Sequence, residues 1–355
     1  MVWFLGRYHN MNWVKNARFV ANHIKTLYNP VKEMVPERKM IMKWFIGIDG
    51  GGTKTDFSIG TSQGVPVKRL TRAGCSYQSI GVQNVVSLIR DGIRDLLTEA
   101  KVSADDCGGC CIGLPCYGEN EAMDQTITDT LRQMLSPIPV KIVNDGVVGL
   151  AGSLNCGEGI HLVAGTGSIA IGCGADGAFA RSGGWTEFFG DEGSCYWIGK
   201  EGMSLFSKEA DGRLPKSALY TIVRDTYGLD DDFEFIDKVM TQIAPHREKT
   251  AAFQRVILEA ANAGDKSAQE LYRRAAKELA QIVAGVRSKL VWSEETVKVS
   301  YFGGLFHAGD WILKPLTEEL SALGCTVHKP MRSATEGALL LAIKEFNNKE
   351  GRMCF

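Results

Sequence analysis

One short segment of the chain combines residue types that can bind phosphate and a metal ion. An apolar strand ends in Asp49 and runs through the glycines at 50–52 to Thr53 and Lys54. Glycines leave a tight turn without side chains, so backbone N–H groups can gather around an anion. The Asp49 carboxylate can hold a magnesium ion, through water bound to that ion. The residues expected at the phosphate are Gly51, Gly52, Thr53 and Lys54.

Two common phosphate loops do not fit this segment. A P-loop has its lysine directly after the last glycine and continues as a helix, but Thr53 separates Gly52 from Lys54 and residues 57–59 read as a strand. The dinucleotide fingerprint also opens a helix. What remains is a strand–turn–strand phosphate loop. It resembles the first phosphate motif of the superfamily that contains actin, heat-shock chaperone ATPases and sugar kinases.

A second glycine turn occupies residues 165–168, and the next residues, 169–172, again read as a strand. Two such hairpin turns, one in each half of the chain, can hold a triphosphate from both sides. We therefore expect Gly165, Thr166 and Gly167 at the phosphates of ATP. Paired glycines also follow the strand at 297–302, and they would let an adenine ring lie against the backbone. The residues expected at the adenine are Gly303 and Gly304.

Asp145 is the candidate catalytic base. It follows an apolar strand at 140–143 and precedes a helix that we expect to begin at Gly146. A helix N-terminus favours the ionised carboxylate, which can accept the proton of an alcohol during phosphoryl transfer. The alternative is an ordinary helix cap, a role that the neighbouring Asn144 could also fill. We expect Asn144 and Asp145 to face the substrate together.

The segment at 182–194 has the composition of a sugar-binding loop. Its Gly-Gly-Trp turn at 183–185 offers backbone N–H groups and an aromatic plane, and Asp191 and Glu192 offer carboxylates for vicinal hydroxyls. A sugar has both a hydroxyl edge and an apolar face. We therefore expect a sugar substrate at this loop.

These motifs together make residues 43–345 resemble N-acetylglucosamine kinase and its BadF/BadG-type ATPase relatives. The resemblance implies that Thr53 and Thr166 contact ATP, that Asp145 is the base, and that Gly303 and Gly304 flank the nucleotide. It also implies a set of sugar contacts. The residues at the sugar would be Ser168, Gly183, Gly184, Trp185 and Asp191.

The chain departs from the animal members of that family at two positions expected to touch the sugar. Ile169 stands where they carry asparagine after the second turn, and Gln78 lies in the segment where they place another asparagine. We expect Gln78 to take that role. The choice between N-acetylglucosamine, glucosamine and N-acetylmuramic acid therefore stays open, with N-acetylglucosamine favoured.

The elements that must position these residues follow an α/β pattern. The expected fold is two actin-like (ribonuclease H-like) domains, each with a mixed sheet flanked by helices, around an ATP cleft. We expect an N-terminal extension at 1–41 that is poorly ordered or not native, a first domain at 42–147, a second with a helical insertion at 148–333, and a closing helix at 334–348 that returns to the first domain. Hinges are expected near 113–118 and 334–338.

The composition of the chain argues against some classes of function. The 355 residues are 45% apolar with a formal net charge of −1, which gives no support for nucleic-acid or membrane-surface binding. No apolar run reaches the roughly 20 residues needed to span a bilayer. The ten cysteines, including Cys107, Cys110 and Cys111, are interpreted as reduced, mainly structural thiols of a cytoplasmic protein.

The sequence thus predicts an ATP- and magnesium-dependent kinase that phosphorylates the 6-hydroxyl of an amino sugar, as a homodimer. A hypothesis from another class is an ATP-driven activator that passes electrons through an iron–sulfur cluster. It would need cysteines at a subunit interface, and it leaves the sugar-binding segment unexplained.

Overall fold

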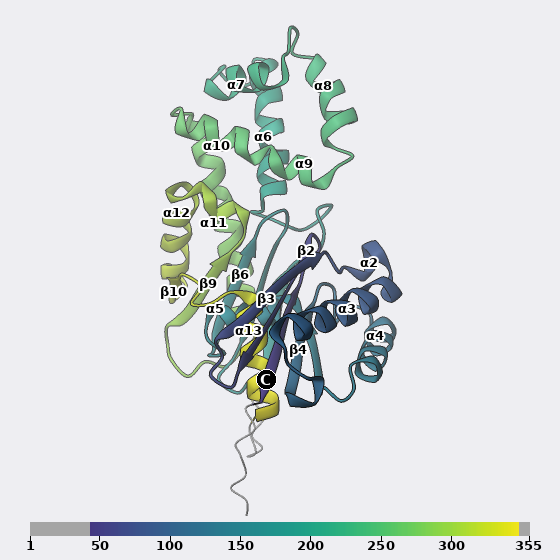
Figure 1. Ribbon diagram of the computed structural model, residues 1–355. Coiled ribbons are helices and arrows are strands. Elements are labelled where there is room, and N and C mark those ends of the chain that lie inside the picture. Colours follow the sequence, from purple (N-terminus) through teal and green to yellow (C-terminus); the bar gives the residue numbers. More distant parts are fainter. Residues whose placement is uncertain (1–42, 348–355) are drawn as a thin grey trace, which may run out of the picture. The chain divides into compact units, whose positions relative to one another are not determined.

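The computed structural model describes residues 43–347, which belong to one unit of the chain (Figure 1). The extension predicted at 1–41 lies outside the described residues, as does the last residue of the predicted closing helix.

The first sheet carries the first glycine turn. Strands β1 (Trp44–Gly50), β2 (Lys54–Thr61) and β3 (Pro66–Ala73) pair antiparallel, while β4 (Cys107–Leu114) and β5 (Val140–Asn144) continue the sheet in parallel with β1. The strand order is β3-β2-β1-β4-β5. Asp49 pairs in register with Gly113, and Leu114 with Asn144, so Asp49 and Asn144 end their strands at the same edge of the sheet.

The second sheet repeats this plan. Strands β6 (Gly159–Ala164), β7 (Ser168–Cys173) and β8 (Phe179–Gly183) pair antiparallel, and β9 (Val297–Phe302) and β10 (Cys325–His328) run parallel to β6. The order is β10-β9-β6-β7-β8. The β6–β7 connection is the second glycine turn, just as the β1–β2 connection is the first.

Two helices join these sheets. Helix α5 (Asp145–Ser153) follows β5, and α13 (Ala334–Asn347) closes the described chain and packs against α5, β1 and β4. They approach closely at Gly337, which has no side chain. A Cβ at this position would collide with the backbone of Val148 and Gly152. The other helices beside the first sheet are α2 (Tyr77–Ile80), α3 (Val82–Ala100), the short η1 (Ala104–Asp106) and α4 (Glu121–Met134).

A largely helical region is inserted between β8 and β9 and extends beyond the second sheet (Figure 1). It comprises α6 (Cys195–Ala210), α7 (Ala218–Tyr227), α8 (Glu234–Lys238), the π-turn η2 (Val239–Ile243), α9 (Arg247–Ala252), α10 (Gln254–Asn262) and α11 (Lys266–Arg287). The short η3 (Gly304–Ala308) and α12 (Asp310–Ala322) follow β9. Leu271, Tyr272 and Leu279 of α11 are fully or almost fully buried and join this region to the second sheet in one hydrophobic core.

The elements agree closely with the sequence prediction. The expected strands and helices of both halves are present, and α5 begins at Asp145, one residue earlier than expected. Strand β8, the short α2 and helix α6 had not been predicted individually. Strand β8 is short and has no buried residue, so it lacks the buried apolar alternation by which a strand is recognised.

Candidate active site

The first glycine turn lines a cavity of about 940 Å³. The turn is closed by hydrogen bonds from Gly51 N to Lys54 O and from Cys75 N to Gly51 O, both 2.9 Å long. Gly52 is exposed, which leaves its backbone N–H accessible to a ligand. The expected phosphate residues that line this cavity are Gly51, Gly52, Thr53 and Lys54, together with Asp49.

Asp145 lies in the wall of the same cavity, at the first residue of α5. Asn144 is the helix N-cap, and its Oδ1 accepts a 2.9 Å hydrogen bond from Gly146 N. Its Nδ2 donates to Tyr117 O at 3.0 Å, which fixes the side chain. Asp145 Oδ1 also accepts from Gly146 N at 2.9 Å. Because Asn144 supplies the cap, the second oxygen of Asp145 remains available for a substrate.

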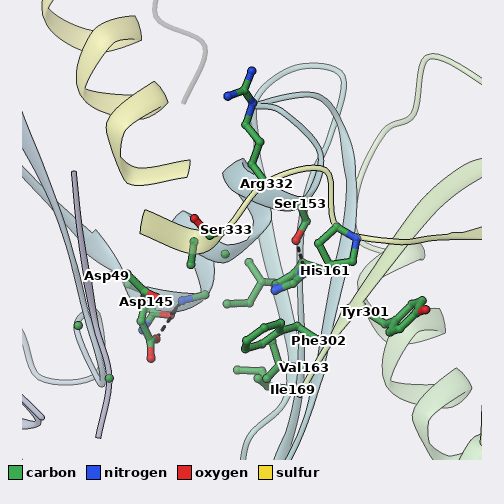
Figure 2. Close-up of a pocket in the computed structure, with 18 of the residues that line it drawn as sticks. Asp49, Asp145, Ser153, His161, Val163, Ile169, Tyr301, Phe302, Arg332 and Ser333 are labelled. Atoms are coloured by element: carbon green, nitrogen blue, oxygen red, sulfur yellow. Dashed lines mark hydrogen bonds between the residues drawn. The ribbon is translucent and has the colours of Figure 1, made fainter. Parts of the chain in front are cut away.

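The two carboxylates in this wall influence each other. Figure 2 shows Asp49 and Asp145 side by side. Burial, reinforced by the negative charges of Asp145 and Asp56, raises the pKa of Asp49 to about 6. Burial also raises the pKa of Asp145. A partly buried pair of carboxylates is the kind of site near which a hard divalent cation is favoured.

The opposite side of the cavity is mainly apolar. Val163, Ile169 and Phe302 lie together there (Figure 2). Beside them, His161 Nδ1 is 2.9 Å from both Ser153 Oγ and Ser300 Oγ. Burial lowers the pKa of His161 to about 4, so the ring is neutral at physiological pH and serves as a hydrogen-bonded core residue.

The second glycine turn rests on the beginning of α6. Gly165 O accepts a 2.8 Å hydrogen bond from Cys195 N, and Thr166 O accepts one of 3.3 Å from Tyr196 N. A Cβ on Gly303 would collide with the carbonyl of Ala164, so the paired glycines after β9 lie directly beside this turn. The residues expected around the nucleotide in the second half are thus neighbours, although none of them lines the 940 Å³ cavity.

The expected sugar residues of the second half cluster around Ser168. Its N–H donates to Asp191 Oδ1 at 3.2 Å, and its Oγ donates to Glu192 O at 2.7 Å. Its carbonyl accepts from Gly184 N at 2.8 Å. Both Gly183 and Gly184 adopt positive φ, 75° and 69°, which favours glycine. Asp191 is only 3% exposed, and Glu192 contributes its backbone carbonyl here.

The structure therefore divides the expected site into two groups. Asp49, the first turn, Asn144 and Asp145 share the cavity, whereas the residues around Ser168 and the second turn form a separate cluster. Gln78 is exposed on α2, and Trp185 is 64% exposed. Neither lines the cavity. Their predicted sugar contacts remain predictions.

Sequence reasoning missed two arginines at these loops. Arg181 of β8 contacts Glu119 across the cavity, with 3.3 Å between Nη1 and Oε1, and donates to Gly184 O at 3.0 Å. Arg247 of α9 pairs with Asp191. An isolated arginine carries no local motif, and in the helical stretch that contains Arg247 the sequence offered only helical periodicity. Only the tertiary structure reveals these contacts.

The loop before Asp191 contains a strained residue. Thr186 has φ of 89°, a region that β-branched residues seldom occupy. Such strain costs roughly 1–3 kcal/mol, whereas glycine adds about 0.4–1 kcal/mol of entropy to the unfolded chain. We expect Thr186→Gly to raise the free energy of unfolding by about 1 kcal/mol in urea titrations. Thr186→Ala is the matched control, because alanine keeps the strain. Equal changes in both variants would contradict this explanation.

The three cysteines of β4 do not all lie on one face of the strand. Cys110 and Cys111 are adjacent in the strand and pack into different hydrophobic clusters, as expected when successive side chains point to opposite faces. Cys107 shares the cluster of Cys110. All three thiols are buried and free of disulfides. These thiols are buried inside the chain and therefore do not present the cysteines that a cluster shared at a subunit interface would require.

Two features are absent from residues 43–347. No helix in this range is long and apolar enough to cross a membrane. Nor do three or more histidine, cysteine, aspartate or glutamate side chains gather there in a way that could hold a metal ion.

Comparisons with known proteins agree with the site and the fold. The model of the BadF/BadG/BcrA/BcrD ATPase family matches residues 46–342. A curated N-acetylmuramic acid/N-acetylglucosamine kinase from Clostridium acetobutylicum is 30% identical over 267 residues, which cover 75% of this chain and 86% of that protein. The N-acetyl-D-glucosamine kinase of Dictyostelium discoideum is 29% identical over 269 residues, covering 73% and 84%.

A solved structure from Chromobacterium violaceum, named as a proposed N-acetylglucosamine kinase, resembles this fold. It is 24% identical, with a TM-score of 0.65 and coverage of 85% of this chain and 99% of that one. Together with the two mixed sheets, this similarity confirms the predicted fold class.

Proposed function

We propose that this chain, which belongs to the BadF/BadG/BcrA/BcrD ATPase family, is an ATP-dependent kinase that phosphorylates the 6-hydroxyl of an amino sugar, with N-acetylglucosamine as the favoured substrate. The observation that carries the proposal is the position of Asp145, which lines the same cavity as the first glycine turn and lies beside Asp49. The kinase names of the relatives support phosphorylation of an amino sugar.

Asp145 has the properties required of a general base. Its Oδ1 is anchored by Gly146 N at 2.9 Å, and burial raises the pKa of the carboxyl. A raised pKa makes the ionised form a better proton acceptor. The proton of the sugar hydroxyl passes to Asp145 as the oxygen bonds to the γ-phosphorus of ATP. The bond from that phosphorus to the bridging oxygen breaks, and ADP leaves.

The glycine turns supply the phosphate contacts in this proposal. The exposed Gly52 and Thr53 would contact the phosphates from the first half, and the turn at 165–167 would contact them from the second. The paired glycines beside the second turn would take the adenine. The domain division at 147/148, the hinges near 113–118 and 334–338 and the homodimer all stay predictions.

Magnesium fits the residues present. Asp49 provides a hard oxygen donor that is separate from the base Asp145, and Mg²⁺ typically binds one or two carboxylates plus substrate phosphates. Asp49 would hold the ion through water, and Mg²⁺ when bound would neutralise charge on the phosphates. A bound cation would also favour the ionised form of Asp49, whose pKa is raised by burial and, secondarily, by the charges of Asp145 and Asp56.

The decisive experiment is an ATP-consumption screen over N-acetylglucosamine, glucosamine, N-acetylmuramic acid, N-acetylmannosamine and glucose. We expect ADP release that depends on an amino sugar, with the product identified as the 6-phosphate by NMR. The 6-deoxy analogue of the best substrate should bind without being phosphorylated. Absence of sugar-dependent turnover with all five compounds would refute the proposal.

A further inference from the structure

Arg247 reaches the second glycine turn from the helical insertion. A Cβ on Gly167 would lie 2.7 Å from Arg247 Nη2 and also 2.7 Å from Asp191 Oδ1. The guanidinium therefore lies against the bare Cα of Gly167, and any side chain at this position would displace it. The helix that carries Arg247, α9, packs against α6, on whose first residues the turn rests.

Two carboxylates hold the guanidinium from one side. Nη2 lies 2.5 Å from Asp191 Oδ2, and Nε lies 3.1 Å from Glu187 Oε2. The Asp191 side chain is 4% exposed, whereas that of Arg247 is 43% exposed. Within residues 43–347, Nη1 of Arg247 has no hydrogen-bond partner. The guanidinium is thus fixed in orientation and keeps one donor edge open.

A phosphate needs such a cation at this place. Lys54, the cation of the first turn, is 67% exposed, and its Nζ is 2.6 Å from Asp56 Oδ2. Catalysis of phosphoryl transfer depends mainly on positioning and on neutralising charge. Arginine suits this task because its planar donors match phosphate oxygens.

We propose that Arg247 binds the phosphates of the nucleotide at the second glycine turn, and that Asp191 and Glu187 hold its guanidinium in place for this contact. The inference rests on the proposed function, because it assigns a residue to the ATP side of that reaction. In the simpler alternative, the ion pair only fastens α9 to the loop at 187–191 and positions Asp191 for the sugar.

The test compares Arg247→Gln and Arg247→Lys with the wild type in binding of the ATP analogue AMPPNP by calorimetry and in steady-state kinetics. We expect Arg247→Gln to weaken AMPPNP binding at least tenfold and to lower kcat/KM for ATP about 100-fold, the typical effect of losing one charge-stabilising donor. Arg247→Lys should recover part of the loss, because it keeps the charge without the planar fork.

The matched control is Arg274→Gln. Arg274 forms a comparable ion pair in the same half, with Nη2 2.8 Å from Glu201 Oε2 and a side chain 49% exposed. Within residues 43–347 its polar and ring contacts are with Glu201 and Trp197, and not with either glycine turn. Its replacement should change AMPPNP affinity less than twofold. Glu187→Gln removes only one support of the guanidinium and should raise KM for ATP a few-fold.

Two outcomes would overturn the inference. One is unchanged AMPPNP affinity in Arg247→Gln with a raised KM for the sugar. That pattern would mean that Arg247 acts only by positioning Asp191 for the sugar. The other is equal effects of Arg247→Gln and Arg274→Gln. If Arg247→Gln does not fold, Arg247→Lys and Glu187→Gln decide by the same criteria. AMPPNP binding needs no sugar, so failure of the inference is separable from a negative sugar screen.

Discussion

Replacing Asp145 by asparagine is expected to lower kcat of the sugar-dependent reaction at least a hundredfold while the sugar still binds. Asparagine is nearly isosteric, and its Oδ1 can keep the hydrogen bond from Gly146 N, which is 2.9 Å long in the wild type. It cannot accept the proton of the hydroxyl. General-base catalysis contributes about 10²–10⁴-fold, or roughly 3–5 kcal/mol of the barrier.

The measurement is kcat from ADP release, paired with sugar affinity from calorimetry. Glu119→Gln is the control, because Glu119 also lines the cavity but lies at its exposed rim. If Asp145, and not any carboxylate of the cavity, is the base, Glu119→Gln should change kcat less than about threefold. A kcat within tenfold of the wild type for Asp145→Asn would remove Asp145 as the base.

The fold could be predicted from the sequence because each half contains a hairpin with a glycine turn followed by strands and amphipathic helices. The run from Trp44 to Gly50 is almost continuously apolar, and the helix at 82–100 carries its buried residues at helical spacing. The roles proposed for Asp49 and Asp145 could be predicted as well, since Asp49 lies at the end of one apolar strand and Asp145 directly follows another.

The partners of these residues could not be predicted in the same way. Asp191 was expected to face a sugar, and its contact with Arg247 joins positions 56 residues apart. Likewise, Arg181 and Glu119 come together only because β8 of the second sheet approaches the loop that follows β4. Arg181 and Glu119 depend on how the two halves pack, and Asp191 and Arg247 on packing within the second half, so no local spacing encodes either pair.

The second large effect is a gain in stability on removing the charge of Asp49. The pKa of Asp49 is raised to about 6, first by burial and then by the charges of Asp145 and Asp56. The folded state therefore disfavours the ionised carboxylate that Mg²⁺ binding would use. We expect Asp49→Asn to unfold at higher urea concentration than the wild type at pH 8, while turnover is largely lost.

The sign follows from proton linkage. In the unfolded chain an aspartate ionises near its ordinary pKa of about 3.9. Below about pH 4 both states are protonated, so Asp49 imposes no penalty. Between that pH and about 6 the folded state retains a proton that the unfolded state has lost, and stability falls as pH rises. Above that range the penalty is constant at roughly 2–3 kcal/mol, from about two pKa units at 1.36 kcal/mol each.

Asp56→Asn provides a control in which the free energy of unfolding should change in the opposite direction. Burial alone would raise the pKa of Asp56, but hydrogen bonds from Lys54 and Thr71 hold it below its usual value. Its charge therefore stabilises the folded state at neutral pH, and Asp56→Asn should be less stable than the wild type there. Urea titrations between pH 4 and 8 measure both variants. If Asp49→Asn and the wild type keep the same difference in unfolding free energy at every pH, the ionisation of Asp49 is not the source of the penalty, and the paired carboxylates lose their support as a magnesium site.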